Sequence, residues 1–155
     1  TAPATSNVVE IGTSLFAART MDFGAANDEF AYFGILMPKS WNAGNLVCQF
    51  IWSTTSTNTG NCIWSLTPTS LGNSDLLTTG FSAQDTVTDA GLGTADDIHI
   101  SPELTISTFA GTATKEDYLT FEVSRDAAVS GDTFSGIARL HGIRIHYTTD
   151  TGSDT

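Results

Sequence analysis

The residues able to carry acid–base, nucleophilic or metal chemistry are few and scattered. The chain has three histidines, His99, His141 and His146, and 17 acidic residues. It contains no G-x-S-x-G elbow, no phosphate-binding glycine loop and no H-E-x-x-H zinc pattern. A glycosidase needs two carboxylates facing one cleft, and the close acidic pairs present here arise by chance in any acidic domain. We therefore predict that the protein is not an enzyme and has no catalytic or cofactor-binding residues.

Two groups of residues are candidates for binding a metal ion: an acidic loop and a pair of histidines. The stretch TDAGLGTADD carries Asp89, Asp96 and Asp97 on a glycine-rich loop, and hard oxygen ligands of this kind suit calcium. Its spacing is not that of an EF-hand, so a solvated loop is favoured over a structural calcium site. His141 and His146 lie on one predicted strand, where ordinary surface histidines are favoured over a metal pair. We predict no metal and no cofactor.

Aromatic residues are the remaining candidates for ligand contact. Trp41 lies in the turn KSWNAGN, where exposure is plausible, and an exposed indole offers a flat apolar face to a sugar ring. Phe50, Trp52 and Trp64 alternate on predicted strands and are expected to pack in the core. Trp41 is therefore the one candidate for a ligand-exposed aromatic.

Four polar residues near the C-terminus are assigned a structural role. Arg125 and Asp126 follow a predicted strand, and Asp132 and Thr133 precede the next one. Asp and Thr side chains commonly accept hydrogen bonds from loop backbone amides. We predict that these four residues hold the turn, in preference to contacting a ligand.

Composition favours strands over helices. Thr and Ser occupy 40 of the 155 positions, and neither residue favours a helix interior. The net charge of −11 leaves six cations, too few for a stripe that follows a nucleic-acid backbone, and it disfavours anionic membranes. No apolar run approaches the roughly 20 residues of a membrane span. The composition argues against a helical bundle, a nucleic-acid partner and a membrane partner.

Short segments with period-2 patterns predict strands. Residues 30–37 are apolar on both faces, as in a strand buried on both sides. Residues 118–124 alternate, with Leu119, Phe121 and Val123 inward. The last strand changes parity between Leu140 and Ile143, which predicts a bulge at Gly142. About eight such strands with turn signals between them predict a single antiparallel β-sandwich, jelly-roll-like in topology.

The two cysteines are expected to be free. Residues 46–53 and 62–66 are predicted to form a hairpin in which Trp52 lies opposite Cys62, and Cys48 opposite Leu66. That register separates the sulfurs by roughly 13 Å at about 3.3 Å per residue. A disulfide needs Cα atoms within about 7 Å. We therefore predict two buried, unlinked thiols.

The predicted domain is bounded by residues 30–150, with a flexible tail over 151–155. Residues 1–29 carry apolar side chains without a clean period, which favours an arm that packs on a neighbouring subunit; a strand at the edge of the chain's own sandwich is the alternative. The residues assigned to this assembly arm are Val8, Val9, Ile11, Leu15 and Phe16.

The sequence also resembles a known group of proteins. Two stretches resemble small phage-type virion surface proteins. The first is YFGILMPKSWNAG, followed by a strand that ends in a Trp, a Gly/Asn turn and a second strand with a Trp. The second is FEVSRDAAVSGDTFSGIARLHGIRIHYT. The resemblance covers roughly residues 30–148. It implies a non-enzymatic structural protein on the virion surface, which decorates the capsid or forms part of a fibre. Its partners would be itself, as a homotrimer, and other virion proteins. The alternative is a glycan-binding module of a host-attachment fibre.

Overall fold

The computed structural model describes residues 2–11, 13 and 16–153 of the chain. Within these residues there is no helix, and hence none long and apolar enough to cross a membrane. The strands are β1 (Ala2–Pro3), β2 (Thr5–Ile11), β3 (Phe16–Phe23), β4 (Glu29–Leu36), β5 (Trp41–Ser53), β6 (Asn61–Leu71), β7 (Asp85–Ala90), β8 (His99–Ile100), β9 (Leu104–Ile106), β10 (Tyr118–Arg125) and β11 (Ala138–Thr149).

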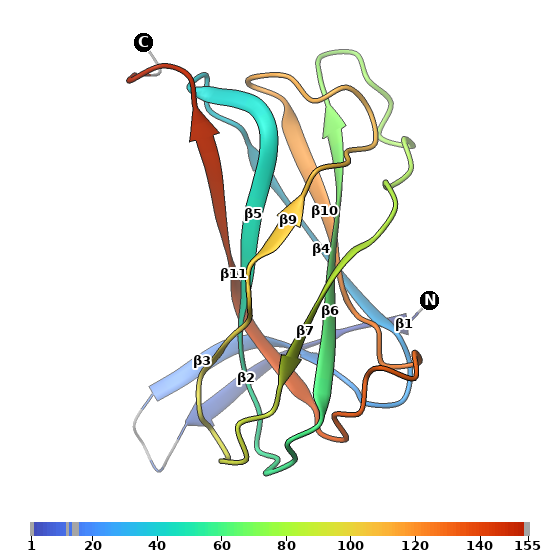
Figure 1. Ribbon diagram of the computed structural model, residues 1–155, viewed down its shortest axis with the longest axis vertical. Helices are drawn as coiled ribbons and strands as arrows, with labels where there is room; N and C mark the ends of the chain where they lie inside the picture. Colours follow the sequence, from blue (N-terminus) through green and yellow to red (C-terminus); the bar gives the residue numbers. More distant parts are fainter. Residues whose placement is uncertain (1, 12, 14–15, 154–155) are drawn as a thin grey trace.

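The strands form two sheets that pack face to face (Figure 1). Sheet A has the order β1-β4-β10-β6-β7, and sheet B has the order β2-β3-β11-β5-β8, with β9 also paired to β5. In each sheet a late strand lies between two early ones, since β10 separates β4 from β6 and β11 separates β3 from β5. This interleaving is the topology of a jelly roll, so the predicted fold class is confirmed.

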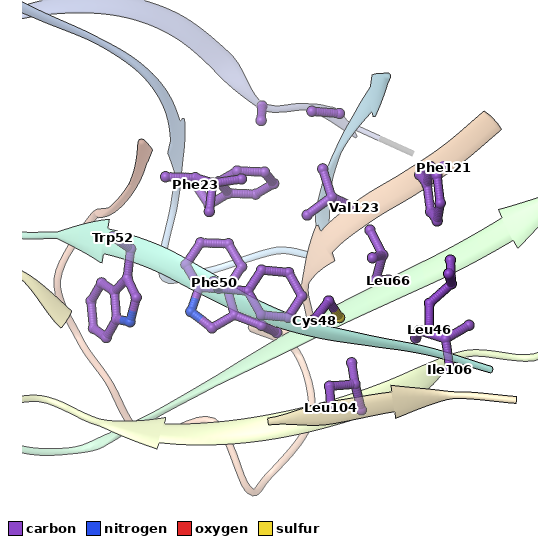
Figure 2. Packing of buried hydrophobic residues seen from close by; sticks show 14 of the residues in the cluster. Phe23, Leu46, Cys48, Phe50, Trp52, Leu66, Leu104, Ile106, Phe121 and Val123 are labelled. Carbon is purple, nitrogen blue, oxygen red and sulfur yellow. The ribbon is translucent and has the colours of Figure 1, made fainter. Parts of the chain in front are cut away.

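The core lies between the sheets and is filled by inward-facing residues (Figure 2). Leu119, Phe121 and Val123 of β10 are buried, which confirms the alternation predicted for this strand. Trp64 of β6 stacks on Phe50 of β5, with ring centroids 5.4 Å apart. The two sheets are therefore held together by aromatic contacts from strands of opposite sheets.

The predicted bulge in the last strand is also confirmed. The register of β11 on β5 shifts between Leu140 and Gly142. The extra residue returns Ile143 and Ile145 to the side of the core, where they are partly buried. Without it, both side chains would face solvent.

The hairpin predicted for residues 46–66 is wrong. β5 pairs with β11, β8 and β9, whereas β6 pairs with β10 and β7, so the two strands belong to different sheets. Their apolar faces meet across the core, and the connection over residues 54–60 crosses from one sheet to the other. An alternating pattern gives the buried face of a strand, but not which strand it pairs with.

Both cysteines are nevertheless free and buried, as predicted, although the reasoning from hairpin register does not hold. Burial raises the pKa of the Cys48 thiol to about 12, and burial likewise raises the pKa of Cys62. A thiol that stays protonated at neutral pH is a poor nucleophile. The two cysteines act as small core residues.

The prediction that residues 30–37 are buried on both faces is wrong for β4. Tyr32 and Leu36 are 60% and 76% exposed on the outer face of sheet A, while Phe33 and Ile35 point toward the core. The strand lies near the edge of its sheet, so apolar residues remain on the solvent side. This outer face becomes one of the candidate sites below.

Candidate functional site

The N-terminal hairpin of β2 and β3 is the first candidate. All seven residues of β2 pair with β3, so the segment forms an edge of the chain's own sheet B, the alternative kept open by the sequence. β3 in turn pairs with β11 only over residues 138–140, and the hairpin extends past the body of the sandwich (Figure 1). Val8 and Phe16 are 57% and 59% exposed. The hairpin therefore presents apolar side chains to solvent.

The other residues assigned to the assembly arm lie in different settings. Val9 is buried and Ile11 is half-buried within the hairpin. Leu15 lies outside the described residues. The apolar surface of the hairpin thus comes from Val8 on β2 and Phe16 on β3.

A cleft of about 810 Å³ opens between the sheets beside this hairpin. One wall comes from β4 and β10 and the other from β3 and β11. The apolar lining residues include Met21, Phe33, Ile35, Val123, Leu140, Ile143 and Ile145. Several of them, among them Ile35 and Ile145, are only partly buried, although they pack against the core. The cleft is an exposed continuation of the hydrophobic core.

Two strand edges without partners border the cleft. On the side away from β10, β4 pairs only with β1, at Glu29 and Phe30. On the side away from β5, β11 pairs only with β3, over residues 138–140. In the described chain, no further strand pairs with residues 31–36 on that side of β4 or with residues 142–149 on that side of β11. Both stretches therefore offer backbone amides and carbonyls to an added strand.

The lining of the cleft has one cation and, in the described part of the chain, no carboxylate. Arg19 and His141 are in the lining, and among the described residues no carboxylate lines it. His141 shares a 2.8 Å hydrogen bond with the Ser53 hydroxyl, and burial followed by the charge of Arg139 lowers the pKa of its imidazole. With 17 acidic residues in the chain, a lining with a cation and no anion favours a negatively charged occupant.

The outer face of sheet A carries a strip of exposed aromatic residues: Tyr32, Phe81 and Tyr118. The rings of Tyr32 and Phe81 stack at 5.9 Å, and the Tyr32 hydroxyl donates a 2.8 Å hydrogen bond to Glu122. This hydrogen bond is the main reason that the pKa of Tyr32 is raised. A Cβ at Gly34 would clash with the Tyr118 hydroxyl, so a larger residue there would displace the Tyr118 ring that lies across β4.

The expectation that Trp41 is exposed is wrong. Its side chain is 0% exposed and packs near Phe109, with ring centroids 6.0 Å apart. Trp41 begins β5, opposite Thr149 of β11, and lies in the core cluster. Residues 107–114 follow β9 and include Phe109, a neighbour that the turn-like sequence around Trp41 did not indicate. The exposed aromatics of the described chain are instead Phe16, Tyr32, Phe81, Tyr118 and Tyr147, and of these a solvent-facing strand at 30–37 would have suggested only Tyr32.

The four turn residues are joined by a dense set of contacts. Arg125 donates to both oxygens of Asp132, at 3.0 and 2.8 Å, and also to the carbonyls of Phe134 and Gly136. Asp132 Oδ2 accepts from the Ile63 amide.

Thr133 and Asp126 complete this turn. The Thr133 hydroxyl accepts from the Asn61 amide, and Asp126 accepts from the Ser124 hydroxyl and the Gln84 amide. Burial is the main cause that raises the pKa of Asp126. These side chains fasten residues 125–136 to β6, so they are occupied in holding the fold.

The acidic loop and His99 contribute to the fold as well. Asp89 accepts a 2.8 Å hydrogen bond from the Trp52 indole, and the Asp96 amide donates to the Thr54 carbonyl. His99 stacks on Trp52 at 3.9 Å, and burial lowers the pKa of its imidazole. Among residues 2–11, 13 and 16–153, no three His, Cys, Asp or Glu side chains are grouped to hold a metal ion. Calcium at Asp89, Asp96 and Asp97 therefore gains no geometric support.

Comparison with known proteins gives a fold and no family. No family model matches the sequence, and no curated protein matches it. The chain is similar to a carbohydrate-binding module, CBM28, described as specific for non-crystalline cellulose: the TM-score is 0.51 and the identity 14%, over 91% of this chain and 79% of that one. This likeness shows a β-sandwich fold alone.

A second similarity is much weaker. It is to the structure of the infectious bursal disease virus Gx strain, with a TM-score of 0.24 and 10% identity, over 96% of this chain and 43% of that one. A TM-score of this size carries no argument about fold or function.

Proposed function

We propose that this protein is a non-enzymatic structural domain on the surface of a virus-type particle, where it decorates the capsid or forms part of a fibre through contacts with copies of itself and with other virion proteins. The resemblance of residues 30–148 to small phage-type virion surface proteins supports this location. The jelly-roll topology is compatible with it. A homotrimer is the proposed assembly.

The observation that carries the proposal is the exposed hairpin of β2 and β3. It is tied to the sandwich by three residue pairs between β3 and β11 and presents Val8 and Phe16 to water. Burial of a large apolar side chain contributes roughly 1.5–3 kcal/mol. Two such side chains on a projecting ribbon favour a protein–protein contact over a solvated role.

A non-enzymatic role is supported by the contacts of the buried ionisable groups, which are made within the fold. Arg125 and Asp132 form a buried ion pair, and Asp117 accepts from Ser70 and from the Thr114 amide and hydroxyl. These side chains satisfy backbone and hydroxyl groups of the fold. None of these three side chains is among the residues that line the cleft between the sheets.

A paired substitution tests the role of the hairpin. The hairpin variant carries Val8→Ser and Phe16→Ser; the control variant carries Val129→Ser and Leu77→Ser, at exposed apolar positions outside the hairpin and the cleft lining. We expect wild type and the control variant to have about three times the 16.4 kDa chain mass by light scattering. The hairpin variant should dissociate at roughly tenfold to hundredfold higher concentration, from the apolar burial it loses.

The thermal unfolding of both variants should stay close to that of wild type, because surface substitutions usually change stability by less than about 0.5 kcal/mol. A monomeric wild-type protein at all concentrations would contradict self-assembly. An oligomer unaffected by the hairpin variant would contradict the role of the hairpin.

The aromatic strip favours a second candidate, a glycan-binding module of a host-attachment fibre. Tyr32, Phe81 and Tyr118 present rings beside the Glu122 carboxylate, and the CBM28 neighbour with the same kind of fold binds cellulose. Aromatic faces with adjacent hydrogen-bonding groups suit sugar rings. A glycan array that gives binding lost in Tyr32→Ala would favour this candidate, and an array without binding would leave assembly as the function.

A further inference from the structure

We infer that the cleft between β4 and β11 is the receptor for the hairpin of a second copy of this chain, with β2 of that copy added to the free edge of β11. The inference rests on the proposed self-assembly and names the two surfaces that make it. Three features of the structure have to be satisfied together by one occupant: backbone edges, apolar walls and positive charge.

The free backbone edge requires an extended peptide. In the described chain, residues 142–149 of β11 have no strand on the side away from β5. The reason is that β3 pairs with β11 only at residues 138–140. β2 ends sheet B, so its own outer edge is also unpaired in the described chain, and it is seven residues long. Two free edges of similar length on one chain are complementary by strand addition.

The apolar walls require an occupant with an apolar side chain on the face that it turns into the cleft. The cleft has Ile143 and Ile145 on one wall and Phe33 and Ile35 on the other. Side chains alternate along β2, so Val8 and Ile11 lie on opposite faces of the hairpin. Phe16 pairs with Ile11 and shares its face. A strand added to the edge of β11 turns one face into the cleft and the other to solvent, and the hairpin has an exposed apolar side chain on each face, Val8 on one and Phe16 on the other.

The charges at this edge favour β2 over an arbitrary apolar peptide. Arg19 lies in the lining, and the free stretch of β11 carries Arg144 and His146. The incoming β2 has one charged residue, the exposed Glu10, whose charge is opposite to that of Arg144. The opposite charges of Arg144 and Glu10 favour β2 at this edge, whereas the net charge of −11 on each copy opposes association, so the contact depends on the backbone edge and the apolar walls.

The contact joins different surfaces of two copies, so it is heterologous. Such contacts form closed rings where the rotation between neighbours allows it, and a ring of three matches the proposed homotrimer. In a ring each copy gives one hairpin and receives one. This arrangement makes a mixing experiment possible, because defects in the two surfaces complement each other.

The test uses two cleft variants beside the hairpin variant. Ile145→Lys and Ile35→Lys place a charge on either wall of the cleft, and Ile137→Lys, at a half-exposed isoleucine outside the lining, is the control. Burial of an unpaired lysine charge in the contact would cost free energy, because the ammonium group would lose its water. Each cleft variant should therefore assemble at least about tenfold more weakly than wild type. Circular dichroism and thermal unfolding select the cleft variant that keeps the wild-type fold.

The deciding sample is an equimolar mixture of the hairpin variant and that cleft variant. Each alone should be monomeric, whereas the mixture should reach about twice the 16.4 kDa chain mass, because one intact hairpin meets one intact cleft. A mixture that stays monomeric, or a cleft variant that assembles like wild type and Ile137→Lys, would overturn the inference while leaving self-assembly in place. A monomeric wild type would overturn both.

Discussion

Replacement of Trp64 by alanine is expected to lower the free energy of unfolding by about 3–5 kcal/mol, the usual cost of a large aromatic cavity. Trp64 of sheet A is 0% exposed and contacts three rings of sheet B: Phe23 at 5.2 Å, Phe50 at 5.4 Å and Trp52 at 6.0 Å between centroids. The cavity cannot collapse easily, because its walls are themselves aromatic residues held by separate strands. Urea unfolding followed by circular dichroism measures the change.

Trp64→Phe is the matched variant for this prediction. It keeps a ring between the sheets and removes an indole N–H that has no hydrogen-bond partner in the described part of the structure. Its cost should therefore be clearly smaller than that of Trp64→Ala. A loss below about 1 kcal/mol for Trp64→Ala would show that this face of β6 is not the core.

Arg125→Met is expected to cost about 3–5 kcal/mol, because it breaks a buried ion pair and leaves one partner charged. Both side chains of the Arg125–Asp132 pair are almost completely buried, at 0% and 2% exposure. The substitution also removes the donors to the Phe134 and Gly136 carbonyls. The turn over residues 125–136 would lose its central fastening, and with it the attachment to Ile63 of β6.

The matched control for this prediction is Arg144→Met. Arg144 is exposed and contacts Gln49 on the surface, so its replacement should change stability by less than about 0.5 kcal/mol. Chemical unfolding of both variants gives the comparison. Equal and small effects at the two positions would mean that Arg125 is not the fastening of the turn.

The sequence was informative where a single strand determines its own pattern. Alternation over residues 118–124 correctly gave the buried face of β10, and the change of parity after Leu140 correctly gave the bulge at Gly142. Both features follow from the period of two along one strand. The count of strands and the turns between them then limited the fold to a sandwich.

The sequence failed where the outcome depends on distant neighbours. The pattern over residues 46–66 predicts a hairpin, but β5 and β6 lie in opposite sheets, and the period of two does not distinguish the two arrangements. Trp41 was assigned to the surface, but Phe109, 68 positions further along the chain, lies over it. The cleft arises because β3 leaves β11 early, and the unpaired edges that border it have no signature in the local sequence.

Hydrogen exchange with mass spectrometry tests most directly whether the hairpin carries the assembly. Wild type, the control variant and the hairpin variant are compared at one concentration at which wild type is assembled. We predict slower exchange over residues 5–11 and 142–149 in wild type and the control variant than in the hairpin variant, because the two edges gain backbone partners on association. Equal exchange over both stretches in assembled and dissociated protein would contradict the account and place the contact elsewhere.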